Sequence, residues 1–276
     1  MNEVIEMLSY PFMQRAFVLG ILVAVSAALL GVSLVLRRYS MIGDGLSHVG
    51  FGALAAATVT NAAPLAVAIP VVIAAAFLLL RISDKSSIKG DAATALISTG
   101  ALALGVLIVS AGGGTNTDLY SYMFGSILAV SGADMVSGSI ISAVIILVFV
   151  LIYQRVFAVT LDESFARASG TKAGLINAVV AVLCAVTIVL GMRLMGTMLI
   201  SALIIFPPLG AMRVFDSFRG VTVFSAVLSA VCFAAGLFAS YFLSLPAGAS
   251  VVAAEIIAFL ILCGAGALTS RFKKEG

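Results

Sequence analysis

The chain consists of long runs of apolar residues separated by short polar connections. A helix that crosses the hydrocarbon core of a bilayer needs about 20 predominantly apolar residues, and nine runs approach that length. The pattern therefore predicts an all-α polytopic membrane protein with one transmembrane domain over residues 1–276 and eight or nine spans. The expected spans are 13–36, 41–60, 64–81, 92–110, 134–153, 173–192, 194–214, 220–243 and 249–270.

Composition excludes an ordinary soluble domain. Of the 276 residues, 62% are hydrophobic and only 10% are charged, and the mean hydropathy is +1.24, whereas soluble domains are about half apolar and about a quarter charged. The net charge of +3 is too small to indicate a nucleic-acid-binding surface. The sequence lacks the phosphate loop G-x-x-x-x-G-K-[ST]. We therefore expect no enzyme on this chain, and any ATP that drives it would be bound by another polypeptide.

The basic residues predict an orientation in the membrane. In the nine-span arrangement, 13 of the 15 Lys and Arg residues fall on one side, and only Arg15 and Arg193 fall on the other. Loops retained in the cytoplasm carry an excess of Lys and Arg. The N-terminus is therefore expected outside and the C-terminus in the cytoplasm. The 13 residues are Arg37, Arg38, Arg81, Lys85, Lys89, Arg155, Arg167, Lys172, Arg213, Arg219, Arg271, Lys273 and Lys274.

Two segments do not fit simple spans. Residues 119–131 are half apolar and too short to cross, so we expect an interfacial or re-entrant helix there, with a plain loop as the alternative. Span 194–214 contains Pro207 and Pro208. Because proline removes a backbone donor and clashes with the preceding turn, this helix is expected to bend or break. The break would mark either a transport pathway or a structural kink.

Asp44 and His48 are the most informative ionisable residues. They stand four residues apart near the start of the second span, so a helix would place both on one face, and His48 is the only histidine. An imidazole and a carboxylate together suit a divalent transition metal. The alternatives are that Asp44 pairs with Arg38 and that His48 is a neutral side chain bonded to a carbonyl.

Two side chains are too few for a complete zinc site, which normally has four ligands. A symmetric dimer with this face on its axis would supply two Asp and two His. Small residues permit close approach of helices in membranes, and the same segment carries four glycines that would allow it: Gly43, Gly45, Gly50 and Gly52.

Glu255 is the other carboxylate deep in an apolar run. Ionisable residues inside membrane spans are costly and often mark function. Glu255 would either line a cation route or be protonated and hydrogen-bonded within the helix bundle.

The longest connection on the basic side, residues 154–172, contains a predicted short helix. Asp162 and Glu163 are typical of an acidic helix start, and Gly170 is typical of its stop. Phe165 and Ala166 would then be available to a partner, although a plain solvated connection is an equal alternative.

Five motifs resemble the zinc/manganese (and iron) permease family of bacterial ABC importers, over nearly the whole chain. They are the runs 35–48, 118–128, 161–170, 195–207 and 245–248. The resemblance implies a permease subunit in the bacterial cytoplasmic (inner) membrane that pairs with a second copy. It implies that an extracytoplasmic metal-binding protein delivers zinc or manganese, which passes inward as cytoplasmic ATP-binding subunits close. The metal would be cargo, with no permanently bound cofactor, and membrane lipid would surround the pair.

The resemblance also implies roles for individual residues. Asp44 and His48 would coordinate the metal in the pore, and the loop near residues 158–171 would dock on the ATPase. Two departures from the family pattern are Phe51 before Gly52, where Pro is expected, and Glu255, where an apolar residue is expected. The coupling-loop residues would be Leu161, Asp162, Glu163, Phe165, Ala166 and Gly170.

Three other functions stay open at this stage. An ABC permease for a metal chelate such as a siderophore or cobalamin would not need Asp44 and His48. A proton- or sodium-coupled secondary carrier would work without an ATPase and should show inverted repeats, which the sequence does not show. A membrane scaffold would give no reason for an aspartate and a histidine on one face.

Overall fold

In the computed structural model, the described residues are 6–7, 9–39, 41–85, 90–112 and 130–275, and every regular element within them is an α-helix. The interfacial helix expected at residues 119–131 falls almost entirely outside this set and stays a prediction. The helices are α2 (Pro11–Leu36), α3 (Ile42–Val59), α4 (Pro64–Lys85), α5 (Gly90–Ala111), α7 (Gly132–Leu161), α8 (Glu163–Ala168), α9 (Ala173–Met195), α10 (Thr197–Ala211), α11 (Phe218–Leu243) and α12 (Ala247–Glu275).

The all-α polytopic membrane class is confirmed. Among the described residues, seven helices are long and apolar enough to cross a membrane, namely α2, α4, α5, α7, α9, α11 and α12. The apolar helix α10 has only 15 residues. Helix α3 has 18 residues and carries Asp44 and His48, whose polar side chains lower its hydropathy. The expected total of eight or nine spans therefore stays a prediction, because it depends on whether α3 and α10 cross the membrane.

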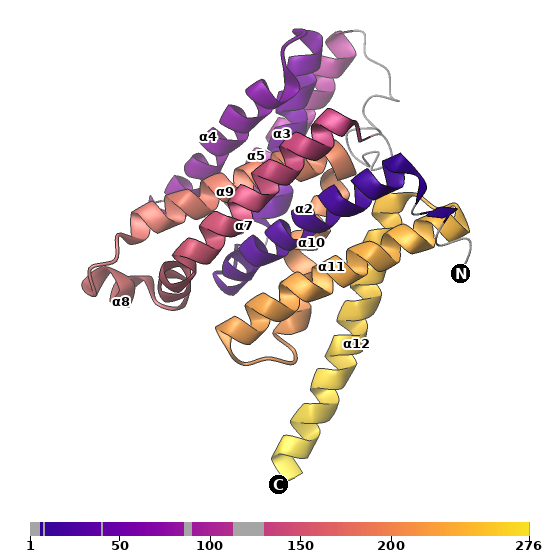
Figure 1. The fold of residues 1–276 in the computed structure, drawn as a ribbon. Coiled ribbons are helices and arrows are strands. Elements are labelled where there is room, and N and C mark those ends of the chain that lie inside the picture. The colour runs from indigo at the N-terminus through magenta and orange to yellow at the C-terminus, as the bar shows by residue number, and fades with distance from the viewer. Residues whose placement is uncertain (1–5, 8, 40, 86–89, 113–129, 276) are drawn as a thin grey trace.

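Helix α2 lies at the centre of the bundle (Figure 1). It is the most buried of the candidate spans, and α7, α9, α10 and α11 all pack against it. Helices α3, α4 and α5 form a group on one side of the bundle, and α11 and α12 lie on the other. The first group holds Asp44 and His48, and α10 contacts both α3 and α12. Helix α10 thus bridges the two sides.

The prolines of α10 do not break it. The helix runs through Pro207 and Pro208 to Ala211, which corrects the expected break, and the chain turns instead at Gly196, whose φ is +88°. Pro208 offers no N–H to the carbonyl of Ile204, four residues earlier. That carbonyl lies against Gly31 of α2, where an added Cβ would sit only 2.1 Å from the oxygen. The absence of a side chain at residue 31 lets α2 close over the freed carbonyl.

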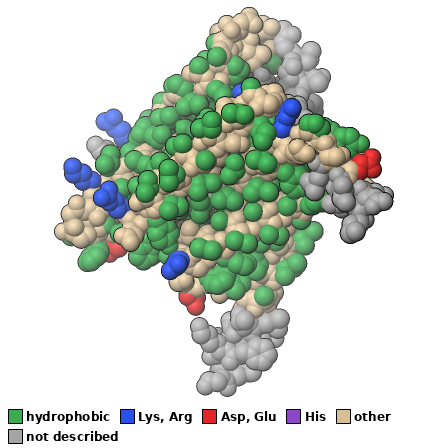
Figure 2. Space-filling model, in the orientation of Figure 1, with side chains coloured by type: hydrophobic (Ala, Val, Ile, Leu, Met, Phe, Trp, Pro, Cys, Tyr) green, Lys and Arg blue, Asp and Glu red, His purple; other side chains and the backbone are tan. Residues whose placement is uncertain are grey.

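The basic residues gather at one end of the bundle. Arg37, Arg81 and Arg167 border one cavity, and Arg155 and Lys172 border a neighbouring one. In Figure 2, hydrophobic side chains fill the middle of the visible face and Lys and Arg lie along its margins. The Arg residues at the far ends of α2, α4 and α7 and in α8 thus meet where α9 begins. We call this the basic end.

At the other end of α9, Arg193 forms an ion pair with Asp134, the two side chains being 3.3 Å apart. Asp134 also belongs to a capping box with Ser131 at the start of α7. Arg193 is therefore anchored by a partner from a second helix.

We predict that Gly31→Ala lowers stability by about 1–3 kcal/mol, because the new methyl group must push α2 away from α10. The midpoint of thermal unfolding in detergent would measure the change. Gly100→Ala in α5 is the matched control, since nothing lies within 4 Å of its Cβ position; it should be neutral or stabilising by about 0.5–1 kcal/mol. Equal effects of the two substitutions would show that α2 and α10 do not depend on this contact.

Candidate functional site

Asp44 and His48 lie on successive turns at the start of α3, as their spacing predicts. The Nε2 atom of His48 is 3.6 Å from Oδ2 of Asp44. The His48 side chain is 19% exposed and that of Asp44 is 41% exposed. The pair is therefore partly covered by the helices around it but still open on one side of the single chain.

A residue on α10 contacts Asp44. The hydroxyl of Ser201 lies 3.4 Å from Oδ1 of Asp44 and 3.1 Å from the carbonyl oxygen of Thr197, and it can donate to either. Ser201 is itself buried. Within the described residues, Asp44 makes no ion pair with Arg38, so the alternative that these two pair is not what the structure shows. Sequence reasoning missed Ser201, because only the packing of α10 on α3 brings it to Asp44.

The glycines of α3 pack inside the chain. An added Cβ on Gly45 would lie 2.5 Å from Cγ2 of Thr94, and one on Gly52 would lie 2.9 Å from the carbonyl oxygen of Ala101, both on α5. Gly43 and Gly50 face α10 and α9 in the same way. The close approach that these glycines allow is therefore made to helices of the same chain. A second copy is not needed to explain them.

A single chain supplies only two side chains of the kinds that bind metals here. Among the described residues, no group of three or more His, Cys, Asp or Glu side chains could hold a metal ion. A complete site would need water, a backbone or hydroxyl group, or a second copy of the chain.

Glu255 lies in α12, which packs against α10 and α11. The side chain is 1% exposed, and neither carboxylate oxygen has a hydrogen-bond partner within the described structure. It therefore does not share a hydrogen bond with Asp44 or His48. The expected hydrogen bond within the bundle is also not formed.

The predicted short helix on the basic side is α8. Asp162 caps it, since its Oδ1 accepts a hydrogen bond of 2.9 Å from the N–H of Phe165. Gly170 follows the helix with a φ of +85°, a conformation that favours glycine. Leu161 and Phe165 are exposed, but Ala166 is fully buried. The expectation that Ala166 is available to a partner is therefore wrong, because this face of α8 packs on the bundle.

Glu163 joins α8 to two other helices. Its Oε2 accepts from Nη2 of Arg37 at 2.5 Å and from Nδ2 of Asn177 at 3.2 Å, and its Oε1 accepts from Arg167 at 2.5 Å. Arg37 also donates to Oδ1 of Asn177 at 2.6 Å. Arg37 is the C-cap residue of α2, and Asn177 lies in the second turn of α9. Sequence reasoning missed both partners, because they lie far from Glu163 along the chain.

This network sets the charge of Glu163. Burial by itself would raise the pKa of Glu163, but hydrogen bonds from Arg167 and Asn177 and the charges of Arg37 and Arg167 outweigh it, and the pKa lies below its ordinary value. Glu163 is therefore an ionised anchor between α2, α8 and α9 at neutral pH.

The architecture and the site define a class of protein: a multi-pass helical membrane protein with an ionisable pair on a partly buried helix and a short capped helix at its basic end. The chain belongs to the ABC 3 transport family, whose model matches residues 9–265. The resemblance that the sequence motifs suggested is thereby confirmed.

Known proteins similar to this chain include two curated relatives and one solved structure. A "probable metal transport system membrane protein" of Thermotoga maritima is 32% identical, over 92% of this chain and 90% of its own length. The manganese import system permease protein ScaB of Streptococcus gordonii is 29% identical, over 91% and 90%. The structure of PsaBC from Streptococcus pneumoniae in complex with Fab matches with a TM-score of 0.85 at 30% identity, over 95% of this chain and 94% of that one.

We predict that Glu163→Gln lowers stability by about 1–3 kcal/mol at neutral pH, because it removes the charge that Arg37 and Arg167 bind. The pKa of folded Glu163 is lowered, so the carboxylate stabilises the fold above the unfolded-state pKa of about 4.3. This contribution is lost as the pH falls through the lower folded-state pKa. The thermal midpoints of wild type and variant should therefore converge on acidification.

The control for this substitution is Arg167→Gln. The Arg167 side chain is 63% exposed, so its loss should cost less than the loss of Glu163. A gap between wild type and Glu163→Gln that stays constant down to strongly acidic pH would contradict an ionised Glu163.

Proposed function

We propose that this chain is the membrane-spanning permease subunit of an ATP-driven, binding-protein-dependent importer of a divalent transition metal ion, which is zinc, manganese or iron. The observation that carries the proposal is the Asp44–His48 pair. It is supported by membership of the ABC 3 transport family and by similarity to a manganese import permease. Asp44 and His48 would bind the ion during its passage.

The separation of the two donor atoms suits a shared ion. Metal–nitrogen and metal–oxygen bonds of about 2.1 Å at a tetrahedral angle place the two donors about 3.4 Å apart. The observed separation of Nε2 and Oδ2 is 3.6 Å. One ion could therefore contact both side chains after a small rotation of either, and Ser201 would hold the Asp44 carboxylate in place.

A second copy would complete the site. The open side of Asp44 allows the same pair from another chain to approach, which would give two carboxylates and two imidazoles around one ion. Binding must remain moderate, since an ion held as tightly as in a structural zinc site would not leave. Water and movement of α3 relative to α10 would keep coordination transient.

The basic end would face the cytoplasm and α8 would meet a separate ATP-binding subunit. The exposed Leu161 and Phe165 provide apolar contact area there, and Glu163 ties α8 to the bundle. The opposite end would receive the ion from an extracytoplasmic binding protein. The N-terminus would thus lie outside the cell and the C-terminus in the cytoplasm of a bacterium.

We predict that Asp44→Ala and His48→Ala each reduce metal uptake by at least about 100-fold, because each removes half of the side-chain ligands of one copy. The measurement is ATP-dependent uptake of labelled zinc and manganese into proteoliposomes that hold this chain, its ATPase and its binding protein. The metal that is taken up faster identifies the cargo.

The control for this experiment is Ser47→Ala. Ser47 lies on the same turns of α3, and its hydroxyl bonds only to the carbonyl of Gly43 in its own helix; uptake should stay near wild type. ATP hydrolysis by the assembled complex should persist in all variants. Normal uptake by both ligand variants would place the ion path elsewhere and favour a chelated cargo, whereas uptake without ATP would identify a secondary carrier.

We predict a smaller effect for Ser201→Ala, about tenfold in the half-saturating metal concentration, which is typical of residues that orient a ligand. The maximal uptake rate should change less, because both ligands remain. A titration of uptake against metal concentration separates the two quantities. A change in maximal rate alone would show that Ser201 acts on helix movement and not on Asp44.

A further inference from the structure

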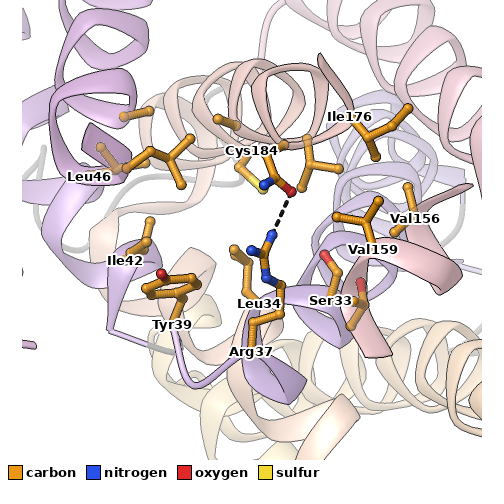
Figure 3. A pocket seen from close by; sticks show the side chains of 16 residues that line it. Ser33, Leu34, Arg37, Tyr39, Ile42, Leu46, Val156, Val159, Ile176 and Cys184 are labelled. Carbon is orange, nitrogen blue, oxygen red and sulfur yellow. Dashed lines mark hydrogen bonds between the residues drawn. The ribbon is translucent and has the colours of Figure 1, made fainter. Parts of the chain in front are cut away.

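An apolar cavity opens beside Arg37 at the basic end of the bundle. It lies between α2, α3, α4, α7 and α9 and has a volume of about 40 Å³ (Figure 3). Along α9, its lining runs from Ile176 to Cys184, a distance of about 12 Å at 1.5 Å per residue. The cavity therefore reaches from the end of the bundle well into its interior.

The body of this cavity is hydrophobic. Arg37 is its only charged lining residue among those described, and in Figure 3 its guanidinium points across the cavity toward α9, where it donates to Asn177. The hydroxyl of Ser33 is already bonded to the carbonyl of Leu30 at 3.0 Å. Ligand sites are typically mostly apolar, with a few polar groups at defined places.

A second cavity, of about 420 Å³, adjoins the first and shares Arg37, Leu80 and Asn177 with it. Its lining adds Arg81 and Arg167, and no acidic residue lines it within the described structure. Arg37 and Arg167 share the single carboxylate of Glu163. Among the side chains that the structure describes, three guanidinium groups thus lie near one carboxylate, which leaves a positive excess at the mouth of the apolar cavity.

The arginines of the two cavities lie near the ends of candidate spans. The candidate spans of α2 and α4 end at Leu36 and Ile82, and that of α9 begins at Ala173, so the arginines stand beside the ends of three spans. A ligand that reached from the second cavity into the first would meet cationic groups at the interface and apolar side chains below it.

We propose that the two cavities together bind an anionic phospholipid, with its phosphate on Arg81, Arg37 and Arg167 and part of an acyl chain in the apolar cavity. Guanidinium groups match phosphate geometry and can bind it through paired hydrogen bonds. Basic pockets between membrane helices on the cytoplasmic side recognise anionic head groups. The bound lipid would brace α2, α4 and α9 where α8 is anchored. This inference does not depend on the identity of the transported ion.

The test compares lipids that share acyl chains and differ in head-group charge. The purified full chain in a neutral detergent would be titrated with phosphatidylglycerol or phosphatidylcholine, and bound lipid would be counted by native mass spectrometry while thermal unfolding is followed in parallel. Wild type should retain phosphatidylglycerol preferentially. Inorganic phosphate alone should bind far more weakly, because it lacks the acyl chain.

Two variants test the two halves of the site. Arg81→Gln should weaken phosphatidylglycerol binding about fivefold, the effect expected for one basic group near an anionic lipid, and should leave phosphatidylcholine unaffected. Ala181→Leu would fill part of the apolar cavity, where residue 181 is a lining residue, and should weaken binding of the lipid but not of inorganic phosphate.

The matched control is Arg155→Gln. Arg155 borders a different cavity at the same basic end, together with Lys172, so it has a similar effect on the overall charge of that end. It should leave phosphatidylglycerol binding unchanged. Equal losses of phosphatidylglycerol binding in Arg81→Gln and Arg155→Gln would show that general surface charge causes the binding and would overturn the site. Equal retention of the two lipids by wild type would also overturn it.

Discussion

In the hydrocarbon of a bilayer, every backbone amide and carbonyl must find its partner within the protein, because an unsatisfied group costs several kcal/mol there. This constraint accounts for the uniformly helical described structure, and two departures from regular helical hydrogen bonding illustrate it. Pro208 leaves the Ile204 carbonyl without its usual donor, and Gly31 lets α2 approach that oxygen. Gly196 takes the one positive φ that separates α9 from α10. Both exceptions involve α10, which brings Ser201 to Asp44.

The basic end and the ionisable pair are physically continuous. Arg37 ends α2 and binds Glu163, and only the short segment from residue 38 to residue 41 separates it from the start of α3. A displacement of α8 must therefore either carry Arg37 with it or separate it from Glu163. The same displacement acts on α9 through Asn177. Helix α8 is in this way joined to α2, which leads into α3, and to α9, which packs on α3.

Local sequence pattern was sufficient for the helices and for the contacts that lie within one helix. Long apolar runs placed most helices within a few residues of their observed bounds, although α7 continues to Leu161, eight residues beyond the expected end at 153. The spacing of Asp44 and His48 placed them on one face of α3. The cap of α8 by Asp162 also follows from neighbouring residues. The positions of Lys and Arg were informative about where the helices end, because these residues are costly in the middle of a membrane span.

Contacts between distant segments could not be predicted in this way. Ser201 meets Asp44 across 157 residues, and Arg37 meets Glu163 across 126; no local pattern encodes either pairing. Ala166 was wrongly expected at the surface, because in a helix as short as α8 the sequence does not show which side faces the bundle. The prolines suggested a bend or a break, but α10 continues through both, and α2 packs on the freed Ile204 carbonyl at Gly31.

The junction at Gly196 controls the direction of α10 relative to α9. One residue joins α9 to α10, so two backbone dihedral angles set the direction of α10 relative to α9. Ser201 stands five residues beyond the junction, about 7.5 Å along the helix axis, and a rotation of about 10° there would shift it by about 1.3 Å. That shift is enough to part the hydroxyl of Ser201 from Asp44, which now lie 3.4 Å apart. The first turns of α9 hold Asn177. A small tilt of α9 that changed the angle at Gly196 would therefore form or break the contact between Ser201 and Asp44.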